Sequence, residues 1–201
     1  DPALPTSLGT MSTPGEVRGL HVVGTTAYLA DDDIGLMIFD VSAPAAPTLR
    51  GYLPLPGWAL DVEVAGDIAY VANRAGLVVV DVTKPEAPKQ VAYVDVPGYA
   101  RAVFVDGLRV FVSHSTGVVA FDVTAPTHPL LWSKSSTPGL ASELVVVDGL
   151  GYIADYDAGL TVVDPSPSYK MELVGSLTTP GYAKHLAVEG EVAYLASSQA
   201  G

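Results

Sequence analysis

The residues that could perform chemistry in this chain are four histidines and a scattered set of acids. The histidines are His21, His114, His128 and His185. Two histidines and a carboxylate can bind a metal or carry out acid–base catalysis, and the candidates for such a site are His114, His185, Glu143 and Asp155. Their spacing does not demand a site. The chain has no cysteine, no glycine-rich phosphate loop and no G-x-S-x-G motif, which excludes thiolate ligands and disfavours several enzyme classes.

Two segments have the alternating carboxylates of a calcium loop. Asp31–Gly35 and Asp155–Gly159 each contain D-x-D-x-G, which can supply the oxygen ligands that calcium prefers. The third acidic ligand and the distal glutamate are missing, and the equivalent segments Asn73–Gly76 and His114–Gly117 are poor in carboxylates. We therefore expect acidic β-turns and no cofactor. The residues to test for calcium are Asp31, Asp33, Asp155 and Asp157.

These residues belong to a unit that is copied along the chain. The dipeptide Pro-Gly begins at residues 14, 56, 97, 138 and 180, so its period is 41 or 42 residues. A period near 40 indicates an array of small supersecondary units. The predicted divisions are a partial unit at 1–12, repeats at 13–54, 55–95, 96–136 and 137–178, and a partial repeat at 179–201.

Each copy is predicted to contain four short strands. In the second copy, residues 59–64 alternate between apolar and polar, 68–72 are β-prone, 77–82 are almost continuously apolar, and 90–94 follow a loop with two prolines. The third strand has one aspartate near its end in every copy, and we expect this residue to cap the following turn. These aspartates are Asp40, Asp81, Asp122 and Asp164.

Four-stranded units of this length predict an all-β fold, a β-propeller with antiparallel blades. Helical repeats are excluded because no segment free of glycine and proline keeps a helical periodicity. The segment Leu-Val-Val-Val-Asp-Val at 77–82, the Pro-x-x-Pro loops at 44–47, 85–88 and 126–129, and the Pro-Gly-Tyr-Ala turn resemble the LVIVD-repeat family. The resemblance implies a propeller on a secreted or surface-attached protein and supplies no catalytic residues.

The two ends of the chain predict an incomplete ring. Residues 1–15 align with 43–57 and would provide the loop and fourth strand of one blade. Residues 179–201 would provide the first and second strands of another. In one interpretation the chain is a segment of a propeller of six to eight blades. In the other, a five-bladed ring lacks one strand, which a partner chain or self-association supplies. The first avoids exposed sheet edges in the complete protein.

Propeller connectivity predicts which loops share a face. The Pro-Gly turns and the connections after the second strands should lie together, and their residues vary between copies while the frame is retained. Two positions give the main candidates: Glu16, Trp58, Tyr99, Leu140 and Tyr182, followed two residues later by Arg18, Leu60, Arg101, Ser142 and Lys184. His185, Glu143, His114 and Asp155 are predicted on the same face. The aromatic rings could instead pack over neighbouring blades.

Charge and composition limit the classes of partner that the protein could bind. The net charge of −12, from 22 acids and 10 bases, disfavours nucleic acid and anionic lipid and fits cations, basic proteins or neutral ligands better. No apolar run is long enough for a membrane helix. Low lysine content suits an extracellular, cell-surface or periplasmic location. We predict a non-catalytic binding or scaffolding propeller whose Pro-Gly face takes a protein, peptide or glycan. The alternative is a propeller hydrolase or lyase with a metal or acid–base site.

Overall fold

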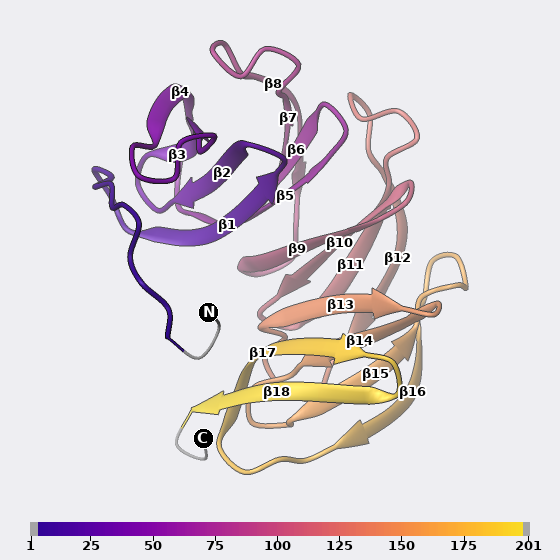
Figure 1. Ribbon diagram of the computed structural model, residues 1–201. Coiled ribbons are helices and arrows are strands. Elements are labelled where there is room, and N and C mark those ends of the chain that lie inside the picture. Colours follow the sequence, from indigo (N-terminus) through magenta and orange to yellow (C-terminus); the bar gives the residue numbers. More distant parts are fainter. Residues whose placement is uncertain (1–3, 199–201) are drawn as a thin grey trace.

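The computed structural model describes residues 4–198, and within that range the chain forms strands and turns only. The 18 strands form four sheets of four strands and one sheet of two, and each sheet is antiparallel with its strands in chain order (Figure 1). No helix that could cross a membrane occurs in this part of the chain.

The five sheets follow one another along the sequence. The first contains β1 (Val17–Val23), β2 (Thr26–Asp31), β3 (Gly35–Asp40) and β4 (Thr48–Pro54). The second contains β5 (Ala59–Ala65), β6 (Ile68–Asn73), β7 (Gly76–Asp81) and β8 (Lys89–Asp95). The third contains β9 (Ala100–Asp106), β10 (Arg109–His114), β11 (Gly117–Asp122) and β12 (Leu130–Ser136). The fourth contains β13 (Glu143–Val147), β14 (Leu150–Ala154), β15 (Leu160–Asp164) and β16 (Glu172–Leu177), and the fifth β17 (Tyr182–Glu189) and β18 (Val192–Ser198).

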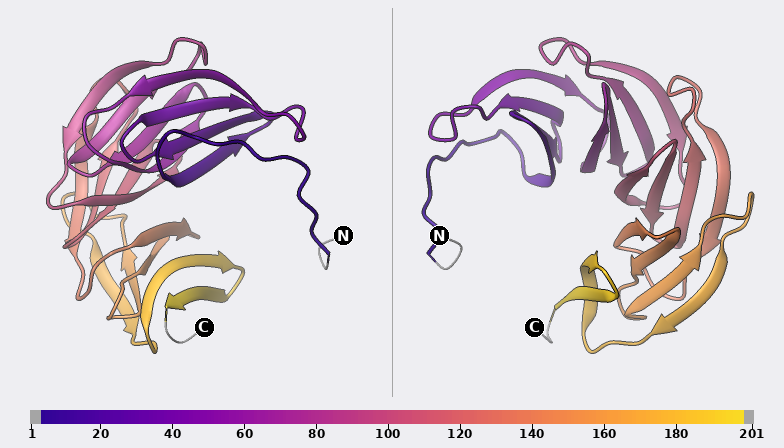
Figure 2. Two further views of the ribbon diagram at one scale, coloured as in Figure 1. Left: turned by 90° about the vertical axis from the view of Figure 1, so that its left-hand side faces the viewer. Right: turned by 45° about the vertical axis from the view of Figure 1, so that its right-hand side comes forward.

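The sheets are arranged as propeller blades around an open arc (Figure 2). The first strand of each sheet contacts the first strand of the next, from β1 through β5, β9 and β13 to β17. These strands therefore lie on the inside of the arc, and the fourth strands lie outside. The predicted all-β propeller with four-stranded antiparallel blades is confirmed.

The aspartate that ends each third strand caps a turn, as predicted. The Oδ1 atoms of Asp40, Asp81, Asp122 and Asp164 accept hydrogen bonds from the backbone N–H two residues later, at 2.8 to 2.9 Å. Hydrogen bonds from the neighbouring serine or threonine hold the pKa of each carboxyl below its usual value. These acids are therefore occupied with local structure on the outside of the arc.

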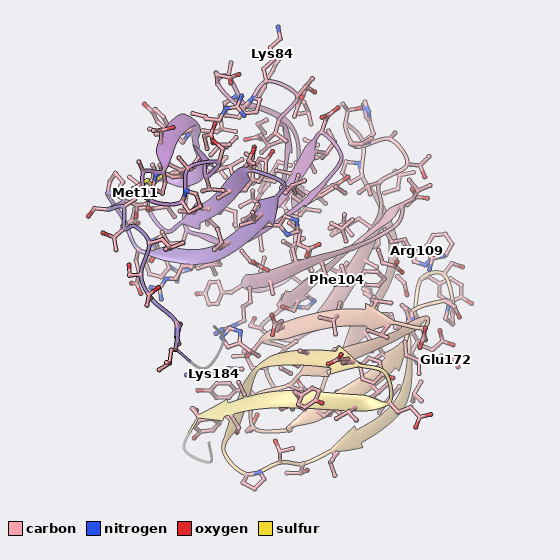
Figure 3. The ribbon with its side chains drawn as sticks, in the orientation of Figure 1. Met11, Lys84, Phe104, Arg109, Glu172 and Lys184 are labelled. Carbon is pink, nitrogen blue, oxygen red and sulfur yellow. The ribbon has the colours of Figure 1, made fainter. Side chains whose placement is uncertain are left out.

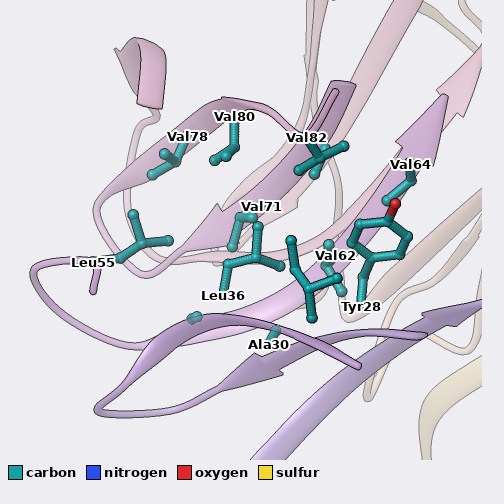
Figure 4. Close-up of a cluster of buried hydrophobic side chains, with 13 residues drawn as sticks. Tyr28, Ala30, Leu36, Leu55, Val62, Val64, Val71, Val78, Val80 and Val82 are labelled. Atoms are coloured by element: carbon teal, nitrogen blue, oxygen red, sulfur yellow. The ribbon is translucent and has the colours of Figure 1, made fainter. Parts of the chain in front are cut away.

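The hydrophobic core lies between neighbouring sheets. One cluster joins Tyr28, Ala30 and Leu36 of the first sheet to Val62 and Val78 of the second, with other valines around them (Figure 4). Similar clusters join the second sheet to the third and the third to the fourth. Burying a valine or leucine side chain stabilises a fold by roughly 1.5–3 kcal/mol, so these contacts hold the blades at fixed positions.

The prediction of a fourth strand in the partial unit at 1–12 is wrong for the described residues 4–12, which form no strand. The reason is that a fourth strand pairs with the third strand of its own blade, and among residues 4–198 every third strand already pairs with another fourth strand. The segment still contacts the first blade in the way an outer strand would. Gly9 lies against Pro44 and Ala45, just as Gly51 in β4 lies against Pro85 and Glu86 of the next blade.

Candidate functional site

A β-bulge interrupts the first strand of four blades at the same repeat position. The pairing of β1 with β2 passes from Val17 to Gly19, so Arg18 has no partner across the ladder. The same shift leaves out Leu60 in β5, Arg101 in β9 and Lys184 in β17. In the fourth blade the equivalent residue, Ser142, precedes β13. A bulge re-aims a side chain relative to the regular strand, and here it does so at one place in each blade.

All five of these residues line one pocket. The pocket has a volume of about 510 Å³ and is bounded by Arg18, Leu60, Arg101, Ser142 and Lys184, together with Trp58, Arg74, Tyr99, Tyr156 and His185. Its walls therefore come from all five blades. Six of the residues predicted as ligand-binding contribute to it: Arg18, Trp58, Tyr99, Arg101, Lys184 and His185.

Two of the predicted aromatic residues hold an arginine between them. The guanidinium of Arg74 lies 4.4 Å from the ring centroid of Trp58 and 4.6 Å from that of Tyr99. These rings remain 43% and 52% exposed. Such cation–π contacts can leave the N–H donors of a guanidinium available to a ligand. The third aromatic, Tyr182, stacks on Tyr156 of the preceding blade at 4.3 Å and is not part of the pocket wall.

The cations of the pocket differ in how they are neutralised. Arg18 donates to Asp32 from Nε and Nη2, at 3.2 and 3.0 Å, and its Nη2 is 2.9 Å from Glu16. Among residues 4–198, no carboxylate lies within ion-pair distance of Arg74, Arg101 or Lys184. His185 lies 3.6 Å from Glu143. The pocket is therefore positively charged, although the chain as a whole is strongly acidic.

The predicted residues at the ends of the second strands are largely structural. Asp31 and Asp155 are fully buried and accept hydrogen bonds from the backbone N–H of Gly15 and Gly139, so they tie the Pro-Gly turns to the second strands. Asp155 also accepts from Thr161 at 2.8 Å. These contacts place the Pro-Gly turns and the ends of the second strands on one face, as propeller connectivity predicts.

His114 lies away from the central pocket. Burial lowers the pKa of its imidazole, and its Nδ1 is 3.3 Å from the backbone N–H of Thr116. It forms part of the wall of a second hollow, of about 1170 Å³, beside β12 and residues 167–173. His114 and His185 therefore belong to different pockets.

The metal candidates do not form a cluster. Within residues 4–198 no group of three histidines or acids is arranged to hold an ion. Asp33 and Asp157 are exposed, whereas Asp31 and Asp155 are buried. Glu143 accepts a hydrogen bond from the backbone N–H of Leu186 in the next blade, at 2.6 Å.

Carboxylates also join neighbouring first strands along the inside of the arc. Asp61 accepts from the backbone N–H of Val103 in the next blade and from that of Val62, both at 2.9 Å. Burial raises the pKa of Asp61 to about 7 despite these hydrogen bonds. Glu63 accepts from the N–H of Val105, and burial raises its pKa as well. These acids satisfy backbone donors at the blade interfaces.

Sequence reasoning missed Arg74 and Tyr156. Arg74 follows Asn73, the last residue of β6, and Tyr156 follows Asp155, which lies directly after β14 and was the candidate that the repeat alignment selected. Successive side chains along an extended strand point in opposite directions, so the residue after a buried one points away from the core. This alternation was the available signal. The position after Asn73 and Asp155 was therefore the better candidate.

Comparison with known proteins identifies the repeat. The model of the LVIVD repeat matches residues 14–53, 56–96 and 138–179, more than half of the chain. No curated protein matches. A crystal structure of a functionally unknown protein from Desulfotomaculum acetoxidans DSM 771 is similar, with a TM-score of 0.79 and 11% identity, over 96% of this chain and 67% of that one. The crystal structure of the computationally designed Ika8 protein has a TM-score of 0.74 and 10% identity, over 90% of this chain and 55% of that one. At these identities the likeness shows the fold alone.

Proposed function

Because this chain belongs to the LVIVD-repeat family, we propose that it is a non-catalytic propeller module that binds a ligand in the central pocket of its Pro-Gly face. The ligand is a protein or peptide segment or a glycan. The proposed location is outside the cytoplasm, which rests on the low lysine content and the acidic pI.

One observation carries the proposal: five blades send the same repeat position into one pocket, four of them through a bulge. A bulge costs ladder hydrogen bonds, and one that recurs at the pocket wall is the kind of feature that binding sites retain. The volume of about 510 Å³ is within the range of ligand pockets, and exposed tryptophan and tyrosine beside arginine are typical of binding surfaces.

The test uses the double substitution Trp58→Ala and Tyr99→Ala. Labelled protein is applied to arrays of peptides and of glycans, and the wild type should retain a set of spots that the double variant loses. We expect a loss of at least tenfold in affinity, because two aromatic walls and the clamp on Arg74 are removed together. Thermal unfolding should change little, since both rings are about half exposed.

The control is Tyr52→Ala, which removes an exposed ring from β4 on the outside of the arc. It should leave the array pattern unchanged. Array binding that survives the double substitution, or a double variant that unfolds, would contradict the assignment of Trp58 and Tyr99 to a binding surface.

A further inference from the structure

We infer that the central pocket recognises a carboxylate attached to an apolar or aromatic body, an inference that rests on the proposed binding function. The pocket contains Arg18, Arg74, Arg101 and Lys184, four of the ten lysines and arginines in the chain. The chain has 22 acids, so carboxylates to neutralise these cations are plentiful. Only Arg18 has such partners among the described residues.

Unneutralised cations in a shared pocket repel one another. Charges within about 10 Å of each other interact at moderate ionic strength, so Arg74, Arg101 and Lys184 raise the energy of the empty pocket. An anion that enters relieves this repulsion and gains charge-assisted hydrogen bonds. Each of these cations comes from a different repeat position or blade, so chance clustering along the sequence does not explain their meeting.

The donor geometry favours a planar anion. The guanidinium of Arg74 contacts the rings of both Trp58 and Tyr99, and these contacts restrict its side chain. A guanidinium can donate to both oxygens of a carboxylate at once. Lys184 extends from β17 on the inner side of the arc (Figure 3). It adds a point charge from the fifth blade, whereas Arg74 comes from the second. Leu60 and the rings of Trp58, Tyr99 and Tyr156 provide apolar wall for the rest of the ligand.

The charge of the whole molecule limits the size of the anion. A net charge of −12 repels a long polyanion over most of the surface, whereas a single carboxylate feels mainly the cations within a Debye length of the pocket. The ligand is therefore a small carboxylate or one acidic residue of a peptide. Both sources present the same chemistry.

The probes are two matched pairs. Hydrocinnamate is compared with hydrocinnamide, and the blocked peptide Phe-Glu-Phe with Phe-Gln-Phe, by NMR titration of the full chain. In at least one pair we expect the carboxylate to bind in the millimolar range or better and its amide to bind at least tenfold more weakly. Binding by hydrocinnamate alone indicates a free small ligand, and binding by the peptide alone indicates a peptide ligand.

Substitutions assign the binding to the pocket. Arg101→Ala with Lys184→Ala should weaken carboxylate binding by roughly tenfold for each cation removed. The control, Lys84→Ala with Lys89→Ala, removes the same charge from β8 and the loop before it, where Lys84 lies far from Lys184 (Figure 3), and should have little effect. Arg74→Lys should also weaken binding, because lysine is neither planar nor bidentate, whereas Lys184→Arg should retain it.

Three results would overturn the inference: no carboxylate probe binds at millimolar concentration, the amides bind as well as the acids, or the two double variants lose affinity equally. Sulfate that competes as strongly as the carboxylates would overturn the preference for a planar anion. If the arrays identify a neutral ligand whose binding depends on Trp58 and Tyr99, the proposed binding function stands and the carboxylate inference is wrong.

Discussion

At the scale of single residues, the inner carboxylates act as interstrand connectors. Asp61 in β5 reaches Val103 in β9, and Glu143 in β13 reaches Leu186 in β17. In the first and third blades the same repeat position is Gly19 and Ala102, which have no side-chain acceptor. The connectors therefore join the second blade to the third and the fourth to the fifth.

Asp61 should make the stability of the protein depend on pH. Burial raises its folded-state pKa to about 7, above the ordinary value near 3.8, so between about pH 4 and pH 7 the folded state binds the proton more tightly than the unfolded state does. The free energy of unfolding should fall as the pH rises through this window and then level off. Glu63, whose pKa burial also raises, acts in the same direction.

Denaturant titrations at several pH values test this. Asp61→Asn should reduce the decline between about pH 4 and pH 7, because asparagine does not titrate and can still accept from Val103. Asp67→Asn, in an exposed turn, removes the same charge and should keep the wild-type slope. Equal slopes in Asp61→Asn and the wild type would show that Asp61 ionises freely in the fold.

At the scale of the strand, each third strand begins at a glycine or directly after one, for a local reason. Gly35, Gly76, Gly117 and Gly159 occupy equivalent positions, and a Cβ at any of them would overlap a backbone carbonyl oxygen of the adjacent fourth strand. Gly117 also has a φ of +147°, which disfavours L side chains. The third and fourth strands can approach only because this position has no side chain.

Two alanine substitutions separate conformation from space. Gly107→Ala, at φ +58° with open space around it, should cost about 1 kcal/mol of unfolding free energy. Gly117→Ala should cost roughly 3 kcal/mol or more, because its Cβ would also meet Ser135 and Ser136. Chemical denaturation measures both, and equal costs would show that β12 can move away from β11.

The strands and their faces could be predicted from the sequence because alternation, glycine and proline are local signals. Arg18, Trp58, Tyr99, Arg101 and Lys184 could be grouped because they share repeat positions. The clamp of Arg74 could not, since it depends on how a turn side chain lies between two blades. The positive pocket was also missed. Net charge predicts cationic or neutral ligands, but it is a sum over the whole chain. It carries no information on where the ten lysines and arginines lie in the fold.

At the scale of the whole molecule, the open arc gives equivalent residues different environments. Leu20 in β1 is 61% exposed, whereas Leu144, at the same repeat position in β13, is 3% exposed. Val62, Val103 and Leu186 at this position are also buried. The other blades bury this face against a neighbouring blade. In the first blade the same face is exposed around Leu20.

This difference predicts unequal costs for the same substitution. Leu144→Ala should lower the free energy of unfolding by about 2–5 kcal/mol, because it leaves a cavity between blades. Leu20→Ala should cost about 0.5 kcal/mol or less, as exposed positions do. Thermal and denaturant unfolding compare the two. Similar losses would mean that Leu20 is covered in solution, for example by another copy of the chain.

The recurring bulge has a consequence for how such a protein can diversify. Its side chain is outside the ladder and outside the interblade core, so it can change without disturbing the frame. One repeat position in each of the five blades therefore sets the chemistry of the pocket wall, and in this chain the five residues are Arg, Leu, Arg, Ser and Lys. A sequence that keeps the scaffold and changes the residues at these five positions would have a different combinatorial specificity. Relatives could therefore be sorted by the residues at these positions before any ligand is known.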